Sequence, residues 1–274
     1  MVKVTGVVGP AGTASHEAAA KIGIKDVKFF RNIPHVFSAL EVEEVQQAIV
    51  PIENVIRGTI GGTVDELYDI EPTITGEVLI PIKLCIACLK TTKKEQIKRI
   101  LSDQKAIAQS LVYLNKKFPD PELENVASAA NAMKMIAEEK LSDSAAIGSE
   151  FAATHYGLKI LDNDIEDRKG NITRYIVIEM EGETKPTGKD KTAIFVLPKS
   201  PEDRPGILYE ILGCFASRKI NLTNLELRPS IEKFGYYNFF VEFEGHQKNS
   251  IVKEALSELK KFADFKVLGS FPKA

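Results

Sequence analysis

The sequence lacks a long apolar run, an N-terminal leader and an excess of charge of either sign. No stretch approaches 18 consecutive apolar residues, so no membrane partner is expected. Met1 to Val4 lead directly into a strand pattern instead of a charged and apolar leader, which favours a cytoplasmic protein. The 36 Lys and Arg residues nearly balance the 38 Asp and Glu residues. A net charge of −2 gives no electrostatic reason to expect nucleic acid binding.

Metal-binding patterns are also missing. Cys85 and Cys88 have the spacing of a redox or metal pair, but they lie in the apolar run LCIACL without a second pair or a nearby His. On a strand, an odd offset sends two side chains to opposite faces of the sheet. We therefore interpret both residues as buried free cysteines and expect no metal site.

What is present is a soluble α/β pattern, and 274 residues are enough for two or three compact units. An alternation of strands and helices over residues 2–51 predicts a first lobe with a parallel sheet. A second α/β lobe follows, in which we expect helices at 93–101, 109–117, 128–139 and 149–156 and strands at 106–107, 145–148 and 158–161. A strand at 171–179, coming after both lobes, is placed to return to the first lobe and to face the cleft between them.

Two glycine-rich turns suit small anions. The turn from Gly9 to Ser15 lacks the Lys of a P-loop and the spacing of a dinucleotide site, so neither nucleotide is expected. Its free N–H groups, with the hydroxyls of Thr13 and Ser15, fit a carboxylate, although a plain helix cap is an equal alternative. A second such turn, at residues 57–63, suggests a substrate with two negative groups. Glu53 and Asn54 end the strand before it, where ligands of open α/β sheets bind.

Thr173 and Arg174 place a hydroxyl and a guanidinium side by side where a polar loop meets an apolar strand. This junction is a candidate site. Adjacent strand residues point to opposite faces, so both can contact one ligand only at a strand end or a twist. The alternative is that Arg174 forms a structural ion pair with Asp164 or Asp167.

The C-terminal part predicts a separate unit. Residues 181–191 are polar, contain Gly and Pro, and read as a linker. Residues 192–274 then follow the order strand, helix, strand, strand, helix, strand, which is a ferredoxin-like βαββαβ unit. In its fourth element, residues 237, 239, 241 and 243 form one apolar face for packing under two helices.

These motifs together resemble the prephenate dehydratase family over nearly the whole chain. The resemblance is carried by Gly9-Pro-x-Gly-Thr-x-Ser15, Pro51-Ile-Glu-Asn54, Gly58 with Thr63 and Asp65, Tyr156-Gly-Leu158 and Asn171-x-Thr-Arg-Tyr175. The C-terminal unit resembles an ACT regulatory domain through Arg204-Pro-Gly-Ile-Leu208, Asn221-Leu222, Glu226-Leu-Arg-Pro229 and Phe240-Val-Glu-Phe-Glu-Gly-His246.

The resemblance implies a two-lobed α/β catalytic domain similar to type II periplasmic binding proteins, followed by a ferredoxin-like ACT domain. We expect the catalytic domain at 1–180, with lobes at 1–80 plus 170–180 and at 81–169, a linker at 181–191 and the ACT domain at 192–274. The implied reaction converts prephenate to phenylpyruvate, water and carbon dioxide as a lyase without a cofactor. The implied catalytic residues are Thr173, Arg174, Glu53 and Asn54, and the implied substrate-binding residues are Gly12, Thr13, Ser15, Gly58, Thr63, Ser102, Gln109, Asn171 and Tyr175.

The resemblance also implies regulation. Phenylalanine is the expected effector, bound between ACT domains of a homodimer or homotetramer by Gly206, Ile207, Leu208, Asn221, Leu222, Glu226 and Arg228. The sequence departs from the family at Ile207 and Leu227, which are bulkier than the usual Ala and Ser. An amino-acid sensor without catalysis on the same fold is the alternative function, and a solute-binding transport protein is a weaker one because the expected leader is missing.

Overall fold

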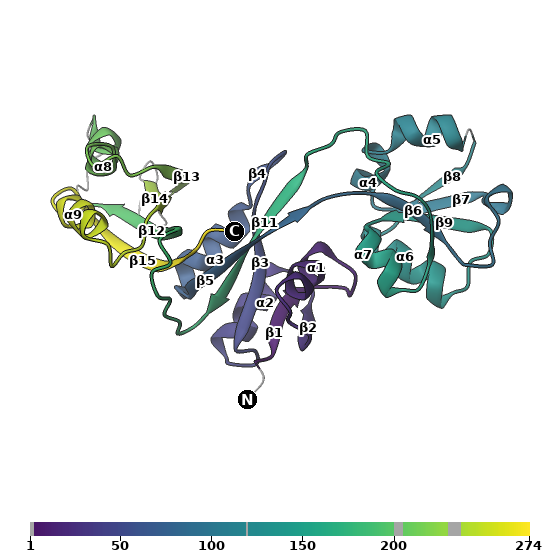
Figure 1. Ribbon diagram of the computed structural model, residues 1–274, viewed down its shortest axis with the longest axis horizontal. Coiled ribbons are helices and arrows are strands. Elements are labelled where there is room, and N and C mark those ends of the chain that lie inside the picture. The colour runs from purple at the N-terminus through teal and green to yellow at the C-terminus, as the bar shows by residue number, and fades with distance from the viewer. Residues whose placement is uncertain (1–2, 119, 200–204, 230–236) are drawn as a thin grey trace.

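The computed structural model describes residues 3–118, 120–199, 205–229 and 237–274, which form three β-sheets arranged along an elongated molecule (Figure 1). The central sheet lies between a distal sheet at one end and a C-terminal sheet at the other. Within the described residues, no helix is long and apolar enough to cross a membrane.

The central sheet has the strand order β2-β1-β3-β11-β5, and the short β4 pairs with β3. Strand β11, which comes late in the chain, lies between β3 and β5 and runs antiparallel to both. The sequence predicted this return for the strand at 171–179. Helix α1 packs on one face, and α2 and α3 pack on the other. The bounds are β1 (Thr5–Val8), α1 (Ala14–Lys21), β2 (Val27–Phe30), α2 (Ile33–Glu41), β3 (Gln47–Asn54), β4 (Gly58–Thr59), α3 (Gly61–Ile70), β5 (Thr73–Pro81) and β11 (Ile172–Glu179).

The distal sheet has the order β10-β6-β9-β7-β8. Two segments, at residues 82–84 and 163–171, join it to the central sheet (Figure 1). Its elements are β6 (Cys85–Cys88), a 3₁₀ turn η1 (Lys94–Gln96), β7 (Arg99–Ser102), α4 (Gln104–Ala108), α5 (Leu111–Lys117), β8 (Glu122–Asn125), α6 (Ala129–Glu138), β9 (Ser144–Gly148), α7 (Glu150–His155) and β10 (Lys159–Asp162).

Two sequence predictions in this sheet are wrong. The expected helix at 93–101 is a short turn followed by strand β7, where Ile100 and Leu101 pack into two separate clusters. The spacing of these apolar residues resembles that of one face of a helix, but β7 is a strand that is buried on both sides. The expected strand at 106–107 lies in helix α4, which Asp103 caps by accepting from the amide nitrogens of residues 105 and 106.

The cysteine prediction is confirmed. Cys85 and Cys88 are both free and buried on β6. Cys85 packs in the cluster with α6 and α7, whereas Cys88 packs in the cluster with α4 and α5 on the other face. Burial raises the pKa of the Cys85 thiol to about 12, so this side chain is an inert apolar group.

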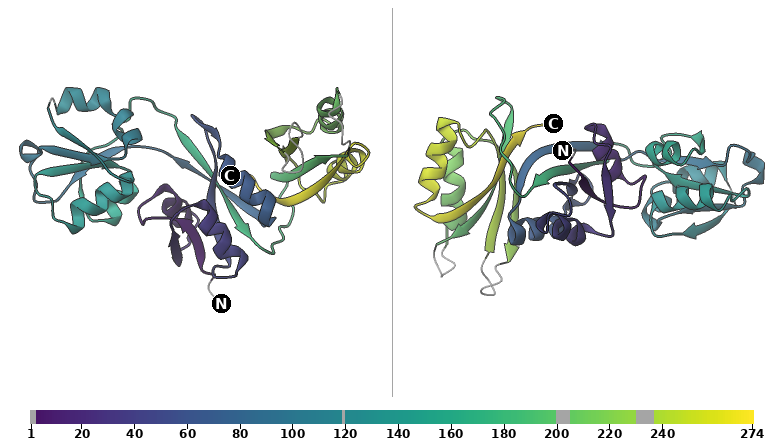
Figure 2. Two further views of the ribbon diagram at one scale, coloured as in Figure 1. Left: turned by 180° about the vertical axis from the view of Figure 1, so that it is seen from behind. Right: turned by 90° about the horizontal axis from the view of Figure 1, so that it is seen from below.

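The C-terminal sheet has the order β13-β14-β12-β15, with α8 and α9 on one face, which confirms the ferredoxin-like unit. Figure 2 shows these helices on the side away from the central sheet. Phe239, Val241 and Phe243 pack under them, but Tyr237 is 44% exposed at the start of its strand, contrary to expectation. The elements are β12 (Asp190–Pro198), α8 (Ile207–Ala216), β13 (Leu222–Pro229), β14 (Tyr237–Glu244), α9 (Ser250–Leu259) and β15 (Ala263–Pro272).

The other face of the C-terminal sheet is buried against the central sheet. Phe195, Phe240 and Phe271 share one apolar cluster with Phe37 of α2 and other residues of the central sheet. The two sheets approach closely at Gly269, where a Cβ atom would meet the carbonyl oxygen of Ile74 well inside contact distance. Its φ of +142° is also a conformation that side chains disfavour. The linker therefore does not hold two separate bodies apart, because their cores are continuous.

Candidate functional site

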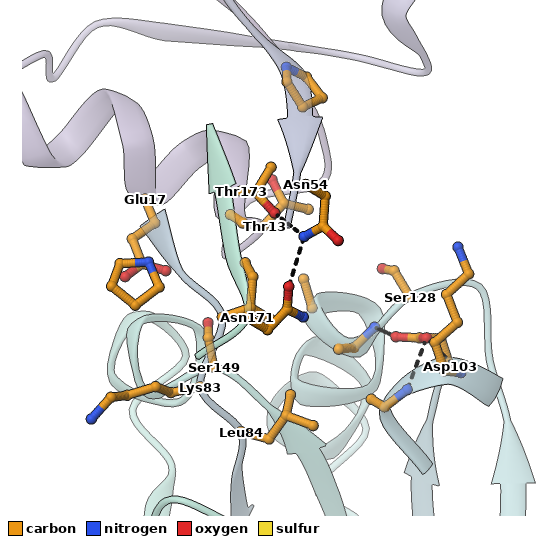
Figure 3. Close-up of a pocket in the computed structure, with 18 of the residues that line it drawn as sticks. Thr13, Glu17, Asn54, Lys83, Leu84, Asp103, Ser128, Ser149, Asn171 and Thr173 are labelled. Atoms are coloured by element: carbon orange, nitrogen blue, oxygen red, sulfur yellow. Dashed lines mark hydrogen bonds between the residues drawn. The ribbon is translucent and has the colours of Figure 1, made fainter. Parts of the chain in front are cut away.

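A pocket of about 410 Å³ lies between the central and distal sheets (Figure 3). Elements of the central sheet supply one wall, and the N-terminal ends of α4, α6 and α7 supply the other. Sequence-predicted site residues that line it are Gly12, Thr13, Asn54, Gln109, Asn171, Thr173 and Tyr175.

Thr173 is held by the side chain of Asn54 on the neighbouring strand. The Asn54 amide nitrogen donates to the Thr173 hydroxyl at 3.0 Å and to the Asn171 side-chain oxygen at 2.8 Å (Figure 3). The Asn54 oxygen accepts from the amide nitrogens of Ile56 and Arg57, both at 3.1 Å, which fixes the orientation of the amide. Because the Thr173 oxygen accepts this bond, its own hydrogen is left to donate to a ligand.

The first glycine-rich turn both caps a helix and borders the pocket, so the two alternatives from the sequence, a helix cap and a ligand-binding turn, are compatible. Thr13 caps α1: its hydroxyl donates to the Val8 carbonyl at 2.9 Å and accepts from the His16 amide at 3.4 Å. The Gly12 amide donates to Nδ1 of His16 at 3.1 Å. Gly12 and Thr13 nevertheless line the pocket. Ser15 does not, because it is buried against Tyr175, with which it forms a hydrogen bond.

Arg174 requires the main correction. We expected it in the cleft beside Thr173, but its side chain points to the opposite face of β11 and is 7% exposed. It binds three carboxylates, those of Glu53, Glu77 and Glu242, instead of Asp164 or Asp167. These partners occupy the guanidinium, so a substrate carboxylate has no access to it. The structural ion pair was the right alternative, with different partners.

Four further predicted residues lie outside the pocket lining. Glu53 is turned away from it by the contact with Arg174. Gly58 lies in β4 without contributing to the wall. The buried hydroxyl of Thr63 donates to the carbonyl of Pro51 at 2.5 Å, and that of Ser102 donates to the carbonyl of Ile147 at 2.8 Å. Each of these hydroxyls makes a hydrogen bond within its own lobe instead of contacting a ligand.

The sequence interpretation missed three cations that line the pocket, Arg57, Lys83 and Lys105. Lys83 also forms a 3.0 Å ion pair with Asp164. Arg57 opens the second glycine-rich turn, which was a usable signal. Lys105 was overlooked because the helix that contains it was expected to be a strand. Two acidic residues, Glu17 and Asp103, also line the pocket. Burial raises the pKa of Glu17, the charge of Lys21 opposes this and that of Glu150 adds to it.

In the C-terminal unit, Gly206 caps α8 with a φ of +93°, and Ile207 and Leu208 pack toward the core. Asn221 hydrogen-bonds the Glu244 carboxylate, and Leu222 and Glu226 lie on β13. Arg228, which we expected at an effector site, instead donates from Nε to Asp65 of α3 at 2.8 Å. Arg204 of the first ACT motif lies outside the described residues.

Metal-binding clusters of three or more His, Cys, Asp or Glu residues are absent from the part of the chain that the structure describes. The polar side chains that line the pocket are five hydroxyl groups, three amides, three cations and two carboxylates, and they surround an apolar interior. Such an arrangement suits a small organic substrate that carries carboxylates and an oxygen able to accept a hydrogen bond.

The family model for prephenate dehydratase matches residues 5–183, and the model for the ACT domain matches residues 195–261. A prephenate dehydratase from Methanocaldococcus jannaschii is 37% identical over 272 residues, 96% of each chain. A bifunctional chorismate mutase/prephenate dehydratase from Aquifex aeolicus is 37% identical over 270 residues, 97% of this chain and 73% of that protein. The solved prephenate dehydratase from Arthrobacter aurescens in complex with L-Phe has a TM-score of 0.86 at 30% identity, covering 99% of this chain and 90% of the other.

Proposed function

Because the chain belongs to the prephenate dehydratase family and carries a C-terminal ACT domain, we propose that its pocket converts prephenate to phenylpyruvate, water and carbon dioxide. This is a lyase reaction. The carbon–carbon bond to the ring carboxylate breaks, its electron pair enters the ring, and the carbon–oxygen bond to the ring hydroxyl breaks. The departing hydroxide takes up one proton from solvent and leaves as water, and aromatisation supplies the driving force.

One observation carries the proposal: Asn54 occupies the acceptor side of the Thr173 hydroxyl and leaves its hydrogen to point to a ligand. In the proposed reaction, this hydrogen bonds the departing ring oxygen and stabilises the charge that develops on it. Asn171 completes the hydrogen-bonded group. An unperturbed Thr hydroxyl is a poor acid, so stabilisation of the leaving group is the role that its chemistry supports.

The substrate carboxylates need cations, and Arg174 is committed elsewhere. We assign them to Arg57 of the second glycine-rich turn, Lys83 of a segment that joins the two lobes and Lys105 of α4, with the Gly12–Thr13 turn as a further anion-binding element. Both lobes thus supply positive charge to the two carboxylates of the substrate. This fixes the ring between them in the orientation that elimination requires.

Regulation is proposed on separate grounds. A relative of 30% identity has been solved in complex with L-Phe, and this chain has Gly206 in a left-handed conformation at the start of α8. We propose that phenylalanine binds near this turn and between the ACT domains of a homodimer or homotetramer. The cytoplasmic location and the absence of a cofactor stay predictions.

The decisive test mixes purified protein with prephenate and follows the ultraviolet absorbance of phenylpyruvate, with and without chelator. Turnover in both conditions supports the proposal. A protein that binds phenylalanine but leaves prephenate unchanged would instead be the non-catalytic sensor. Recovery of activity only after zinc or magnesium is added would overturn the assignment of leaving-group stabilisation to Thr173.

A further inference from the structure

One face of strand β11 borders the pocket, and its other face packs toward the C-terminal sheet. Thr173 and Tyr175 lie on the pocket side. Between and beyond them, Arg174, Ile176 and Ile178 lie on the side that packs toward the C-terminal sheet. Because successive strand residues alternate between faces, the backbone unit that carries the Thr173 hydroxyl also carries the side chain that contacts the other domain.

That contact is made by Glu242 of β14. Its carboxylate is 0% exposed and accepts two bonds from Arg174, at 3.0 Å from Nη1 and at 2.6 Å from Nη2. Paired bonds of this kind fix both distance and angle, because guanidinium and carboxylate are planar. The ACT domain therefore holds the catalytic strand through one rigid side-chain pair.

Two other strands of the central sheet hold the same guanidinium. Glu53 on β3 accepts from Nε at 3.0 Å, and Glu77 on β5 accepts from Nη1 at 3.1 Å. Lys191 on β12 donates to the same Glu77 oxygen at 2.9 Å. Burial raises the pKa of Glu77, but hydrogen bonds from Ala274 and Lys191 and the charges of Lys191 and Arg174 outweigh it, so the pKa is lowered.

The local geometry transmits the position of Arg174 to the pocket. Arg174 faces Glu53 and Thr173 faces Asn54 across the β3–β11 ladder, and the register shifts immediately afterwards, between Arg174 and Tyr175. Such an irregularity bends a strand and re-aims its side chains. The bond that Asn54 donates to Thr173 thus lies one residue away from the bond that Arg174 donates to Glu53.

We propose that Glu242 is a positioning residue for the reaction: by holding Arg174, it holds the Thr173 hydroxyl in place. This inference rests on the proposed function of the pocket. It gives the ACT domain a direct hold on the catalytic strand. Glu242 faces Asn224 of β13 in the C-terminal sheet, the strand that carries proposed effector residues. A movement of that sheet must carry Arg174 with it or leave a buried carboxylate unpaired.

The test compares Glu242→Gln with Glu71→Gln. Both substitutions remove a carboxylate that pairs across the same interface, but Glu71 binds Lys266 at the exposed end of α3, far from β11 in sequence. In the prephenate assay, Glu242→Gln should lower kcat about 10- to 100-fold with KM changed less than about 3-fold, the scale expected for a misplaced catalytic group. Glu71→Gln should match the wild type. Glu242→Asp, which keeps the charge on a shorter side chain, should fall between them.

A second readout does not need turnover. With threonine methyl groups labelled for NMR, the Thr173 signal should shift in Glu242→Gln and stay unchanged in Glu71→Gln. Wild-type kcat, a loss confined to KM, or an unmoved Thr173 signal in Glu242→Gln would overturn the inference. If Glu242→Gln does not fold, Glu242→Asp carries the same comparison. An inactive wild type would count against the proposed function, whereas the NMR result would still decide the positioning role.

Discussion

The side chains of Asn54 and Thr173 face each other across adjacent strands, with the Asn54 amide nitrogen 3.0 Å from the Thr173 hydroxyl oxygen. Thr173 is only 8% exposed, so its hydroxyl is available to a ligand inside the pocket and not to bulk water. The arrangement is that of an oriented hydrogen-bond donor, which stabilises a transition state because its orientation is set in advance.

Thr173→Ala should lower kcat by about 10²- to 10⁴-fold with a much smaller change in KM, because it removes a bond made to the leaving group and not the groups that bind the carboxylates. Steady-state kinetics with prephenate measure this. Thr173→Ser keeps the hydroxyl and is the matched control. Near-normal kcat in Thr173→Ala would move the catalytic role to another residue of the pocket.

The two arginines should respond differently. Arg57→Ala removes a pocket cation and should raise KM for prephenate about 10- to 100-fold at little cost in stability, as expected for one charge-assisted bond of about 1.5–3 kcal/mol. Arg174→Ala leaves Glu242 buried without its cation and removes one of the two cations that pair with Glu77, so it should lower the free energy of unfolding by about 3–5 kcal/mol. Kinetics and urea denaturation on both variants separate the roles. Equal stability of the two variants would contradict the assignment.

Stability should fall on mild acidification because of His16. Burial, and then the charge of His155, lowers the pKa of His16 below its ordinary 6.5, so the unfolded chain binds the proton more tightly than the folded one. Stability is therefore complete above pH 6.5 and is lost as the pH falls from 6.5 through the folded-state pKa. The cation also cannot accept the bond from the Gly12 amide.

Chemical denaturation at a series of pH values measures this slope. His16→Asn, whose side-chain oxygen can accept from Gly12 without titrating, should flatten it. His35→Gln, on an exposed position of α2, should leave it unchanged. A slope that survives in His16→Asn would assign the effect to another group.

Gly269→Ala should weaken the contact between the C-terminal and central sheets. The new Cβ would meet backbone atoms of Ile74, which cannot rotate away, and overpacking of this kind costs about 1–3 kcal/mol. Gly213→Ala is the control, because apart from its chain neighbours and the backbone of its own helix no atom of the described residues lies within 4 Å of its Cβ position, and alanine favours a helix. Thermal unfolding should show a lower Tm for the first variant and an equal or higher one for the second.

The sequence predicted the elements that have a regular pattern. The βαββαβ unit, the returning strand at 171–179 and the opposite faces of Cys85 and Cys88 all follow from periodicity, and the structure contains them. The region around residues 93–107 was mistaken because β7 is buried on both faces, which removes the alternation that identifies a strand.

The candidate site was only partly predictable for a different reason. Motif position identifies Thr173 and Asn54, and alternation along the strand puts Arg174 on the other face, but its partner Glu242 lies 68 residues away in another sheet. No local pattern connects these residues. Lys83 and Lys105 likewise reach the pocket only through the packing of the two lobes, so their role could not be read from their neighbours in the chain.

The continuous apolar cluster between the C-terminal and central sheets has a consequence for how the protein unfolds. Phe195, Phe240 and Phe271 cannot leave that cluster without exposing the residues of α2 and α3 that they cover. These two sheets should therefore melt in a single cooperative transition. The distal sheet has its own clusters and two connecting segments, so it is free to open separately. The boundary between independently unfolding units thus lies within the catalytic domain, whereas the strand that carries Thr173 belongs to the same unit as the C-terminal sheet.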